Sequence, residues 1–340
     1  MIFLTYKEIL DNQKSNMSLT TAWWTNFLFH FTDVHNASRI LYDGWIYSRK
    51  QAIEKAIMVN DNASRAVIEA TNTDTKCYGR LYFRPLTPTQ YHNEGYKPVE
   101  IRDSGINASC PVPIFFCLNS NATLNYPGTK FAEKGLAGNR HQITEGIDDF
   151  SKLNFEKIYH NGPYSAENGD IKEYRHSEVI REGGFPVEPL LQCILCRTPA
   201  ERETLLFLLN QYSARLYNTY KDKVLYKPSL LCFNNNGIFI KRVNILGKVL
   251  SIEFNDPEVR QKKSGISDPI VRTSIHIVYK TLDGRILSVS TGIGNFNYYN
   301  VRTCSLDLRE DISYDIIRVT VHFDDVVMYE NELYLSDALF

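Results

Sequence analysis

A glutamate stands where a charged stretch of the chain turns into an apolar run. From residue 173 the chain reads Glu-Tyr-Arg-His-Ser-Glu-Val-Ile, so that Glu178 directly precedes Val179 and Ile180. β-Branched apolar residues favour a strand, and Glu178 is therefore expected where a strand begins and the backbone holds its side chain rigidly. A carboxylate held there against a sugar can bind a hydroxyl, stabilise positive charge as a glycosidic bond breaks, and accept a proton. Glu178 is the first candidate catalytic residue.

Three other stretches stand upstream of this glutamate in a fixed order. Residues 29–36 read Phe-His-Phe-Thr-Asp-Val-His-Asn and lead into a short segment that ends at Gly44; residues 64–66 read Ser-Arg-Ala; residues 81–91 read Leu-Tyr-Phe-Arg-Pro-Leu-Thr-Pro-Thr-Gln-Tyr. Taken alone, a histidine at the end of an apolar run is more often a core or turn residue than a ligand, and a surface arginine is usually only solvated. The order of the stretches gives them a second interpretation.

Together, the four stretches resemble the DarT family of DNA-targeting ADP-ribosyltransferase toxins. The resemblance covers roughly residues 25 to 200 and implies an α+β, ADP-ribosyltransferase-like fold with a split, mixed β-sheet and NAD in its cleft. It implies transfer of ADP-ribose from NAD, a co-substrate, onto a thymine or guanine base of single-stranded DNA, with release of nicotinamide. It also implies a toxin or anti-phage effector that a macrodomain-type antitoxin restrains.

The resemblance also assigns roles to particular residues. Glu178 and one arginine are expected to be catalytic, and we assign the arginine to Arg65, with Arg49 as the alternative, because a guanidinium can clamp phosphates or polarise the acceptor base. His30 is expected to hold ribose hydroxyls. The residues expected to bind NAD are His30, Thr32, Asn36, Gly44, Arg49, Tyr82, Phe83 and Tyr91.

The stretch from residue 130 to residue 157 is the expected DNA-recognising element. Gly135 and Gly138 permit close backbone approach, and basic residues alternate with aromatic ones that can stack on bases. The chain departs from the family's Pro-Arg-Ser-Pro pattern, because Leu86 takes the usual arginine place and the basic residue precedes the first proline. The residues expected to contact DNA are Arg84, Lys130, Lys134, Arg140 and His141.

Composition limits the other possibilities. The chain has 340 residues with 38 basic and 39 acidic side chains, which excludes a globally polycationic nucleic-acid binder and leaves only a local DNA site. Seven cysteines, an odd number, suit a reducing cytoplasm better than a disulfide framework. No apolar stretch reaches membrane-spanning length, so a soluble cytoplasmic protein is expected.

Two motifs are set aside. Cys193-Ile-Leu-Cys196 has the spacing of a zinc or redox pair, but no second pair follows at metal-ligand spacing, and we expect a buried strand without metal. Gly292-Ile-Gly294 lacks the third glycine and the following helix of a dinucleotide fingerprint, so a turn is expected there.

The pattern of apolar residues predicts two domains after an N-terminal extension at residues 1–24. Residues 25–228 mix strands (27–31, 79–83, 113–118, 179–180, 191–196) with helices (37–43, 50–67, 150–160, 200–221). Residues 229–340 form a β-rich accessory domain with strands at 238–243, 248–254, 273–279, 285–291 and 315–323. Asp283-Gly284 is the strongest hairpin signal in the chain.

Two rival functions stay open at this point. One is an enzyme of the same fold that modifies RNA or protein. The other is a module that binds nucleic acid or an antitoxin and has lost catalysis. Suitable side chains at His30, Arg65 and Glu178 argue against the second.

Overall fold

The centre of the protein is an eight-stranded mixed sheet. The structure, a computed structural model, describes residues 4–55, 73–102, 109–136, 142–164 and 169–335. The sheet has the order β10-β9-β4-β1-β3-β7-β5-β6, and only β9 and β10 run parallel. Its strands are β1 (Phe27–Asp33), β3 (Tyr78–Tyr82), β4 (Pro113–Asn119), β5 (Thr129–Ala132), β6 (Ile143–Thr144), β7 (Glu178–Glu182), β9 (Leu191–Cys196) and β10 (Val224–Tyr226).

The sheet is split between β1 and β3. All residues of β1 have a partner on β4, but β1 and β3 share a single partner pair, Phe29 and Tyr82. The halves β10-β9-β4-β1 and β3-β7-β5-β6 are each well paired and meet at this weak join. The expected α+β fold with a split, mixed sheet is confirmed.

A small two-stranded sheet lies against the join. It consists of β2 (Trp45–Tyr47) and β8 (Gly184–Pro186) and contacts β3 and β7. A Cβ atom at Gly79 would overlap the backbone of Gly184, and a Cβ at Gly184, where φ is +102°, would overlap the carbonyl of Ile46. Glycine at these two positions lets the backbones of the two sheets touch.

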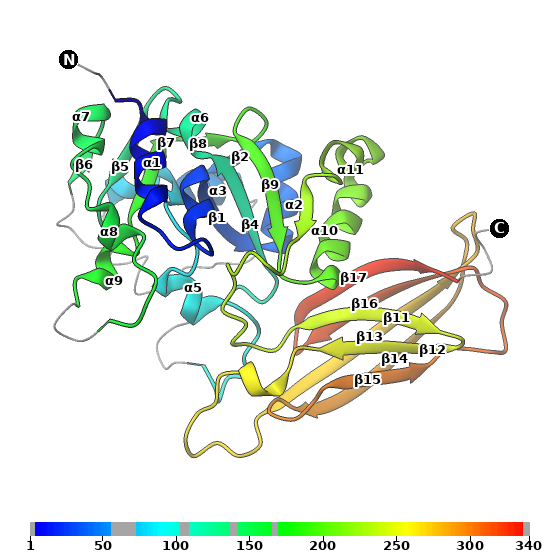
Figure 1. Cartoon of the computed structure of the whole chain (residues 1–340). Coiled ribbons are helices and arrows are strands. Elements are labelled where there is room, and N and C mark those ends of the chain that lie inside the picture. Colours follow the sequence, from blue (N-terminus) through cyan, green and yellow to red (C-terminus); the bar gives the residue numbers. More distant parts are fainter. Residues whose placement is uncertain (1–3, 56–72, 103–108, 137–141, 165–168, 336–340) are drawn as a thin grey trace.

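Short helices connect and cover the strands (Figure 1). They are α1 (Tyr6–Ser15), η1 (Ala22–Asn26), α2 (Val34–Asp43), α3 (Arg49–Glu54), η2 (Thr73–Cys77), α5 (Pro88–Asn93), α6 (Ser120–Leu124), α7 (Ile147–Phe150), α8 (Phe155–Ile158), α9 (Ile171–Tyr174), α10 (Pro199–Tyr212) and α11 (Ala214–Tyr220). Asp33 caps the start of α2 by accepting from the His35 N–H, and Gly44 ends α2 in the left-handed region at φ +74°. In the part of the chain that the structure describes, no helix has the length and apolar character needed to cross a membrane.

Two of the predicted helices are wrong in extent. The helix expected at 200–221 is two helices, because Ser213 adopts an extended conformation and its hydroxyl accepts from the Leu216 N–H to start α11. The helix expected at 150–160 is replaced by α7 and α8, which Asn154 separates by capping the start of α8. Polar residues that bond to the backbone favour such new starts over helix interiors.

Residues before the first strand pack onto the part of the fold that contains the eight-stranded sheet. Trp24 is fully buried, and the ring of Tyr6 lies edge-on to Phe150 with 4.9 Å between ring centroids. The segment expected as an N-terminal extension therefore contributes to the core of the fold.

The part of the chain from residue 229 onward, which we call the C-terminal half of the fold, forms two further antiparallel sheets (Figure 1). One has the order β11-β12-β15 and the other β14-β13-β16-β17. The strands are β11 (Ile240–Leu246), β12 (Val249–Phe254), β13 (Ile270–Lys280), β14 (Ile286–Asn297), β15 (Thr303–Asp307), β16 (Ile316–Phe323) and β17 (Val326–Tyr334), and the short η4 (Pro257–Val259) follows β12. The predicted hairpin at Asp283-Gly284 is confirmed by pairing of β13 with β14. The turn expected at Gly292–Gly294 is wrong, because both glycines lie within β14.

The two halves share one hydrophobic core. A single cluster of buried side chains runs from Ile9 through Phe116 to Tyr329. The Tyr329 hydroxyl donates to the Glu203 carboxylate at 2.9 Å, and the Glu330 N–H donates to the Thr204 hydroxyl at 3.2 Å. The domain boundary at residue 228 stays a prediction, and α10 makes contacts on both sides of it.

Candidate active site

Glu178 is the first residue of β7, as the sequence predicted. It lies between Tyr82 on β3 and Ala132 on β5, and only 3% of its surface is exposed. Its Oε2 atom accepts from the Leu136 N–H at 3.2 Å and lies 3.5 Å from Nη1 of Arg80. Among the residues that the structure describes, no hydrogen bond goes to Oε1. One carboxylate oxygen is therefore held in place, and the other accepts no hydrogen bond from the described residues.

The backbone just before Glu178 is tied down on several sides. The Ser177 carbonyl accepts from the Phe83 N–H at 3.5 Å, and the Ser177 hydroxyl donates to the carbonyls of Tyr174 and Glu133. A Cβ atom at Gly135 would lie 2.8 Å from Cβ of His176. The close approach that Gly135 permits is thus to the segment that carries Glu178, whereas the sequence suggested an approach to the target.

Burial raises the pKa of Glu178 above its ordinary value, and the Arg80 guanidinium and the Leu136 N–H partly oppose this rise. Burial, together with the negative charge of Glu178, also raises the pKa of Tyr82, so this phenol stays neutral. The site holds one carboxylate in a poorly solvated place, where its charge acts strongly on anything bound beside it.

His30 lies on β1, across the split in the sheet from Glu178. Its Nδ1 atom is 3.2 Å from the Arg80 carbonyl, and burial lowers the pKa of the imidazole to about 4. A neutral imidazole that faces a carbonyl must place its proton on that nitrogen, so Nδ1–H donates to Arg80. The Nε2 atom is then an acceptor, suited to a ligand hydroxyl.

Arg80 joins the two sides of the site. Its carbonyl binds His30, and its guanidinium reaches Glu178 and the Thr75 carbonyl. Sequence reasoning missed this residue, although a signal was present: Arg80 is two residues before Tyr82 and therefore on the same face of β3.

Comparison with known proteins bears directly on this arrangement. A family model described as "ssDNA thymidine ADP-ribosyltransferase, DarT" matches residues 29–226, which is more than half of the chain. The chain belongs to the DarT family. No curated protein sequence matches it.

Solved DarT structures are similar to the chain at low sequence identity. DarT from Thermus sp. 2.9 in complex with NAD+ has 16% identity and a TM-score of 0.46, with 60% of this chain and 96% of that chain covered. The same protein with ADP-ribosylated ssDNA has 15% identity and a TM-score of 0.48, with 60% and 95% covered. DarTG from Thermosipho africanus with ADP-ribose has 14% identity and a TM-score of 0.43, with 65% and 53% covered.

The DarT region brings some of the predicted NAD-binding residues together. His30 and Tyr82 lie on the two strands that meet at the split, and Tyr82 is opposite Glu178. Thr32 and Asn36 are buried on β1 and α2. Gly44 ends α2, and Arg49 begins α3, which follows β2.

Two predicted NAD-binding residues lie apart from this group. Phe83 directly follows β3 and packs, fully buried, among Phe150, Phe155 and Tyr159. Tyr91 is 51% exposed on α5. Neighbouring side chains of an extended backbone point to opposite sides, so Phe83 is expected to face away from Tyr82.

Three predicted site residues lie outside the described residues: Arg65, Arg140 and His141. The choice between Arg65 and Arg49 as the key arginine therefore stays as the sequence left it. No group of three or more His, Cys, Asp or Glu side chains that could hold a metal ion occurs in the described ranges.

Arg84 lies in the interior of the DarT region. It is 1% exposed, its guanidinium donates to the carbonyls of Pro85 and His160 and to the Asn161 side chain, and it lies 4.6 Å from the ring of Trp24. Burial lowers its pKa to about 9. These contacts give Arg84 a structural role, and a contact with DNA would require them to open.

The two described lysines of the predicted DNA surface are paired with carboxylates. Lys130 lies 3.2 Å from Glu145, and Lys134 lies 2.6 Å from Glu173. A groove of about 450 Å³ lies beside Lys134, and its lining includes Glu133, Asp149 and Lys152. Exposed ion pairs of this kind are weak, so a phosphate could exchange with the carboxylate.

Proposed function

We propose that this protein transfers ADP-ribose from NAD onto a thymine base of single-stranded DNA and releases nicotinamide. The observation that carries the proposal is the buried carboxylate of Glu178 opposite Tyr82: Arg80 and Leu136 fix one oxygen, and the other accepts no hydrogen bond from the described residues. The description of the family model supports thymine as the base.

The chemistry assigned to Glu178 follows from its surroundings. When the bond between the nicotinamide nitrogen and the ribose carbon breaks, the electron pair leaves with nicotinamide and positive charge develops on the ribose. A carboxylate beside the ribose stabilises this charge and can hydrogen-bond the 2′-hydroxyl. The base then forms the new bond to the ribose carbon, and its displaced proton passes to Glu178 or to water.

His30 and Tyr82 are proposed to orient the ribose. Nε2 of His30 accepts a hydrogen bond from a ribose hydroxyl because Nδ1–H is committed to the Arg80 carbonyl. Tyr82 is neutral and placed opposite Glu178, so its hydroxyl can donate to the sugar without adding charge. The other proposed NAD-binding residues are Thr32, Asn36, Gly44 and Arg49. For Phe83 and Tyr91 we propose only that they help to shape the NAD-binding pocket.

The proposed DNA surface consists of Lys130, Lys134, Arg140 and His141. Phosphates would compete with Glu145 and Glu173 for the two lysines, so only a small gain is expected from each. We leave Arg84 out of this surface because its guanidinium is buried.

The cellular role is proposed from the family alone. We propose a toxin or anti-phage effector that acts in the cytoplasm and is paired with a macrodomain-type antitoxin.

Single-stranded DNA should be labelled in preference to duplex, RNA or protein when the protein is incubated with labelled NAD. Base edges are hidden by pairing and stacking, and extruding a base from a duplex costs a few kcal/mol. Because few phosphates are engaged, the binding constant should depend only weakly on salt. The logarithm of the binding constant should fall with the logarithm of the salt concentration with a slope of about −0.7 per neutralised phosphate. Equal labelling of duplex, or preferential labelling of RNA or protein, contradicts the assignment, and an absence of label in all pools indicates a non-catalytic module.

Activity should be lost on acidification at a higher pH than an ordinary glutamate would dictate. The reaction needs ionised Glu178, and burial raises its pKa, so protonation begins closer to neutral pH. Activity is therefore present above the raised pKa of Glu178 and is lost as the pH falls through it. The measurement is the rate of nicotinamide release as a function of pH. An acid limb at or below the pKa of a free glutamate would show that another group controls the rate.

A further inference from the structure

The side chain of Gln90 connects the two halves of the protein. It lies on α5 with 1% of its surface exposed. Its Oε1 atom accepts from the Leu86 N–H at 2.6 Å, and its Nε2 atom donates to Oε2 of Glu94 at 2.7 Å and to the Cys232 carbonyl at 2.8 Å. Both ends of the amide and both amide protons are therefore in use.

On one side, Gln90 holds the turn that follows β3. Leu86 in this turn has φ +58°, a left-handed conformation that a leucine adopts only when its surroundings enforce it. The turn begins directly after Tyr82 and ends at α5, whose Thr89 hydroxyl lies 3.0 Å from Nε2 of His176. Since Nδ1 of His176 faces the Lys172 carbonyl, Nε2 is the acceptor and Thr89 is the donor. His176 is two residues before Glu178.

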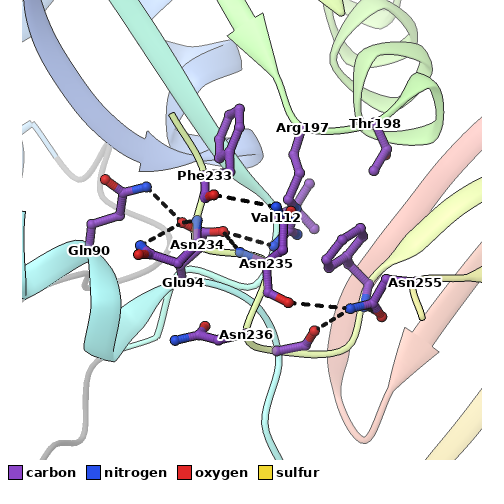
Figure 2. Close-up of polar contacts among 12 residues, drawn as sticks. Gln90, Glu94, Val112, Arg197, Thr198, Phe233, Asn234, Asn235, Asn236 and Asn255 are labelled. Atoms are coloured by element: carbon purple, nitrogen blue, oxygen red, sulfur yellow. Dashed lines mark hydrogen bonds and ion pairs between the residues drawn. The ribbon is translucent and has the colours of Figure 1, made fainter. Parts of the chain in front are cut away.

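On the other side, Gln90 and Glu94 hold the segment that leads into the C-terminal half (Figure 2). Glu94 is fully buried and accepts from the N–H groups of Asn234 and Asn235, each at 2.9 Å. The Asn236 side chain donates to the Tyr91 carbonyl at 2.8 Å. Successive backbone N–H groups, with Asn235 at φ +60°, form a concave site that suits an anion, and the Glu94 carboxylate fills it.

We propose that Gln90 is a positioning residue through which the C-terminal half sets the geometry of Glu178 and Tyr82. The chain of contacts runs from Cys232 through Gln90 to the Leu86 turn and α5, and from Thr89 to His176. The C-terminal half is thus part of the catalytic unit. The activity readout of this proposal rests on the proposed function.

The test compares three substitutions in the full chain. Gln90→Leu keeps the size of the side chain and removes its three hydrogen bonds; Thr89→Val removes only the bond to His176. Thr204→Val is the matched control, because it removes a bond between the halves, from the Glu330 N–H, that does not pass through α5. Gln90→Leu should lower kcat for nicotinamide release about tenfold or more with little change in KM for NAD, since misplacement of a reacting group costs mainly turnover. Thr89→Val should cause a smaller fall in kcat, and Thr204→Val should lower the unfolding temperature but leave kcat unchanged.

Amide hydrogen exchange at Leu136 provides a readout that needs no activity. This N–H donates to the Glu178 carboxylate, so its protection should fall in Gln90→Leu and stay unchanged in Thr204→Val. Normal kcat and normal Leu136 protection in Gln90→Leu would overturn the proposal. If Gln90→Leu does not fold, the same two measurements on Thr89→Val test the proposal, and normal values there overturn it. If the unmodified protein releases no nicotinamide, the proposed function fails, and exchange at Leu136 alone decides the positioning role.

Discussion

Glu178→Gln should lower ADP-ribose transfer by a factor on the order of 100 or more without lowering the stability of the protein. The amide keeps the size of the side chain but removes the charge that stabilises the developing positive ribose, and deletion of one such group has an effect of this order. Stability should be kept or increased, because the carboxylate is buried at a cost that the raised pKa reflects. Turnover by mass spectrometry of the modified oligonucleotide and thermal unfolding measure the two effects.

Glu182→Gln is the matched control for this substitution. Glu182 lies four residues further along β7, on the same face of the strand, and is exposed. The same change of charge there should leave turnover near normal. Near-normal turnover in Glu178→Gln would remove Glu178 from the chemistry, and an equal loss in both variants would indicate a general effect of charge.

Arg197→Met should lower the free energy of unfolding by about 3–5 kcal/mol, because removal of one partner leaves buried charge without compensation. Arg197 and Glu94 face each other in Figure 2, with 3.4 Å between Nη1 and the carboxylate. Arg197 also pairs with Glu201, and all three side chains are at most 2% exposed. The guanidinium also lies 3.7 Å from the ring of Phe239. Chemical denaturation measures the loss.

Arg302→Met provides the comparison with an exposed pair. Arg302 is 61% exposed and lies 3.1 Å from Asp256, and such pairs contribute less than about 1 kcal/mol. A loss in Arg197→Met as small as the one in Arg302→Met would contradict the buried network. A large loss in both would point to instability of the C-terminal half itself.

Local sequence patterns predicted the strands well where a clear apolar run or a clear turn signal was present. The apolar run at residues 191–196 coincides with β9, and the change from charged to apolar residues correctly placed Glu178 at the start of β7. Asp283-Gly284 gave the hairpin, with Gly284 at φ +85°. The terminal strand β17 was missed because polar and apolar residues do not alternate clearly in it, and the short strand β15 was missed although Cys304 and Leu306 alternate with polar residues.

A local sequence pattern could not predict the role of residues whose partners lie far away in the sequence. Glu94 and Arg197 received no role from the sequence, yet they pair across 103 positions in the interior. Arg84 was expected to contact DNA, but Trp24 and the His160 carbonyl enclose it. Arg80 could have been found by applying the alternation of a strand to Tyr82, a step that needs only the residue two positions before.

The bonds between the halves also govern when the fold can be completed during synthesis. The ribosome releases the DarT region first, at roughly 5–20 residues per second, and domains generally fold as they emerge. Here, however, Glu94 meets its backbone partners only when Asn234 and Asn235 have emerged, and Thr204 gains its contact only with Glu330. A nascent chain therefore carries Glu178 for several seconds before Asn234 and Asn235, the backbone partners of Glu94, have been synthesised, and the bonds between the halves form only after the DarT region has emerged.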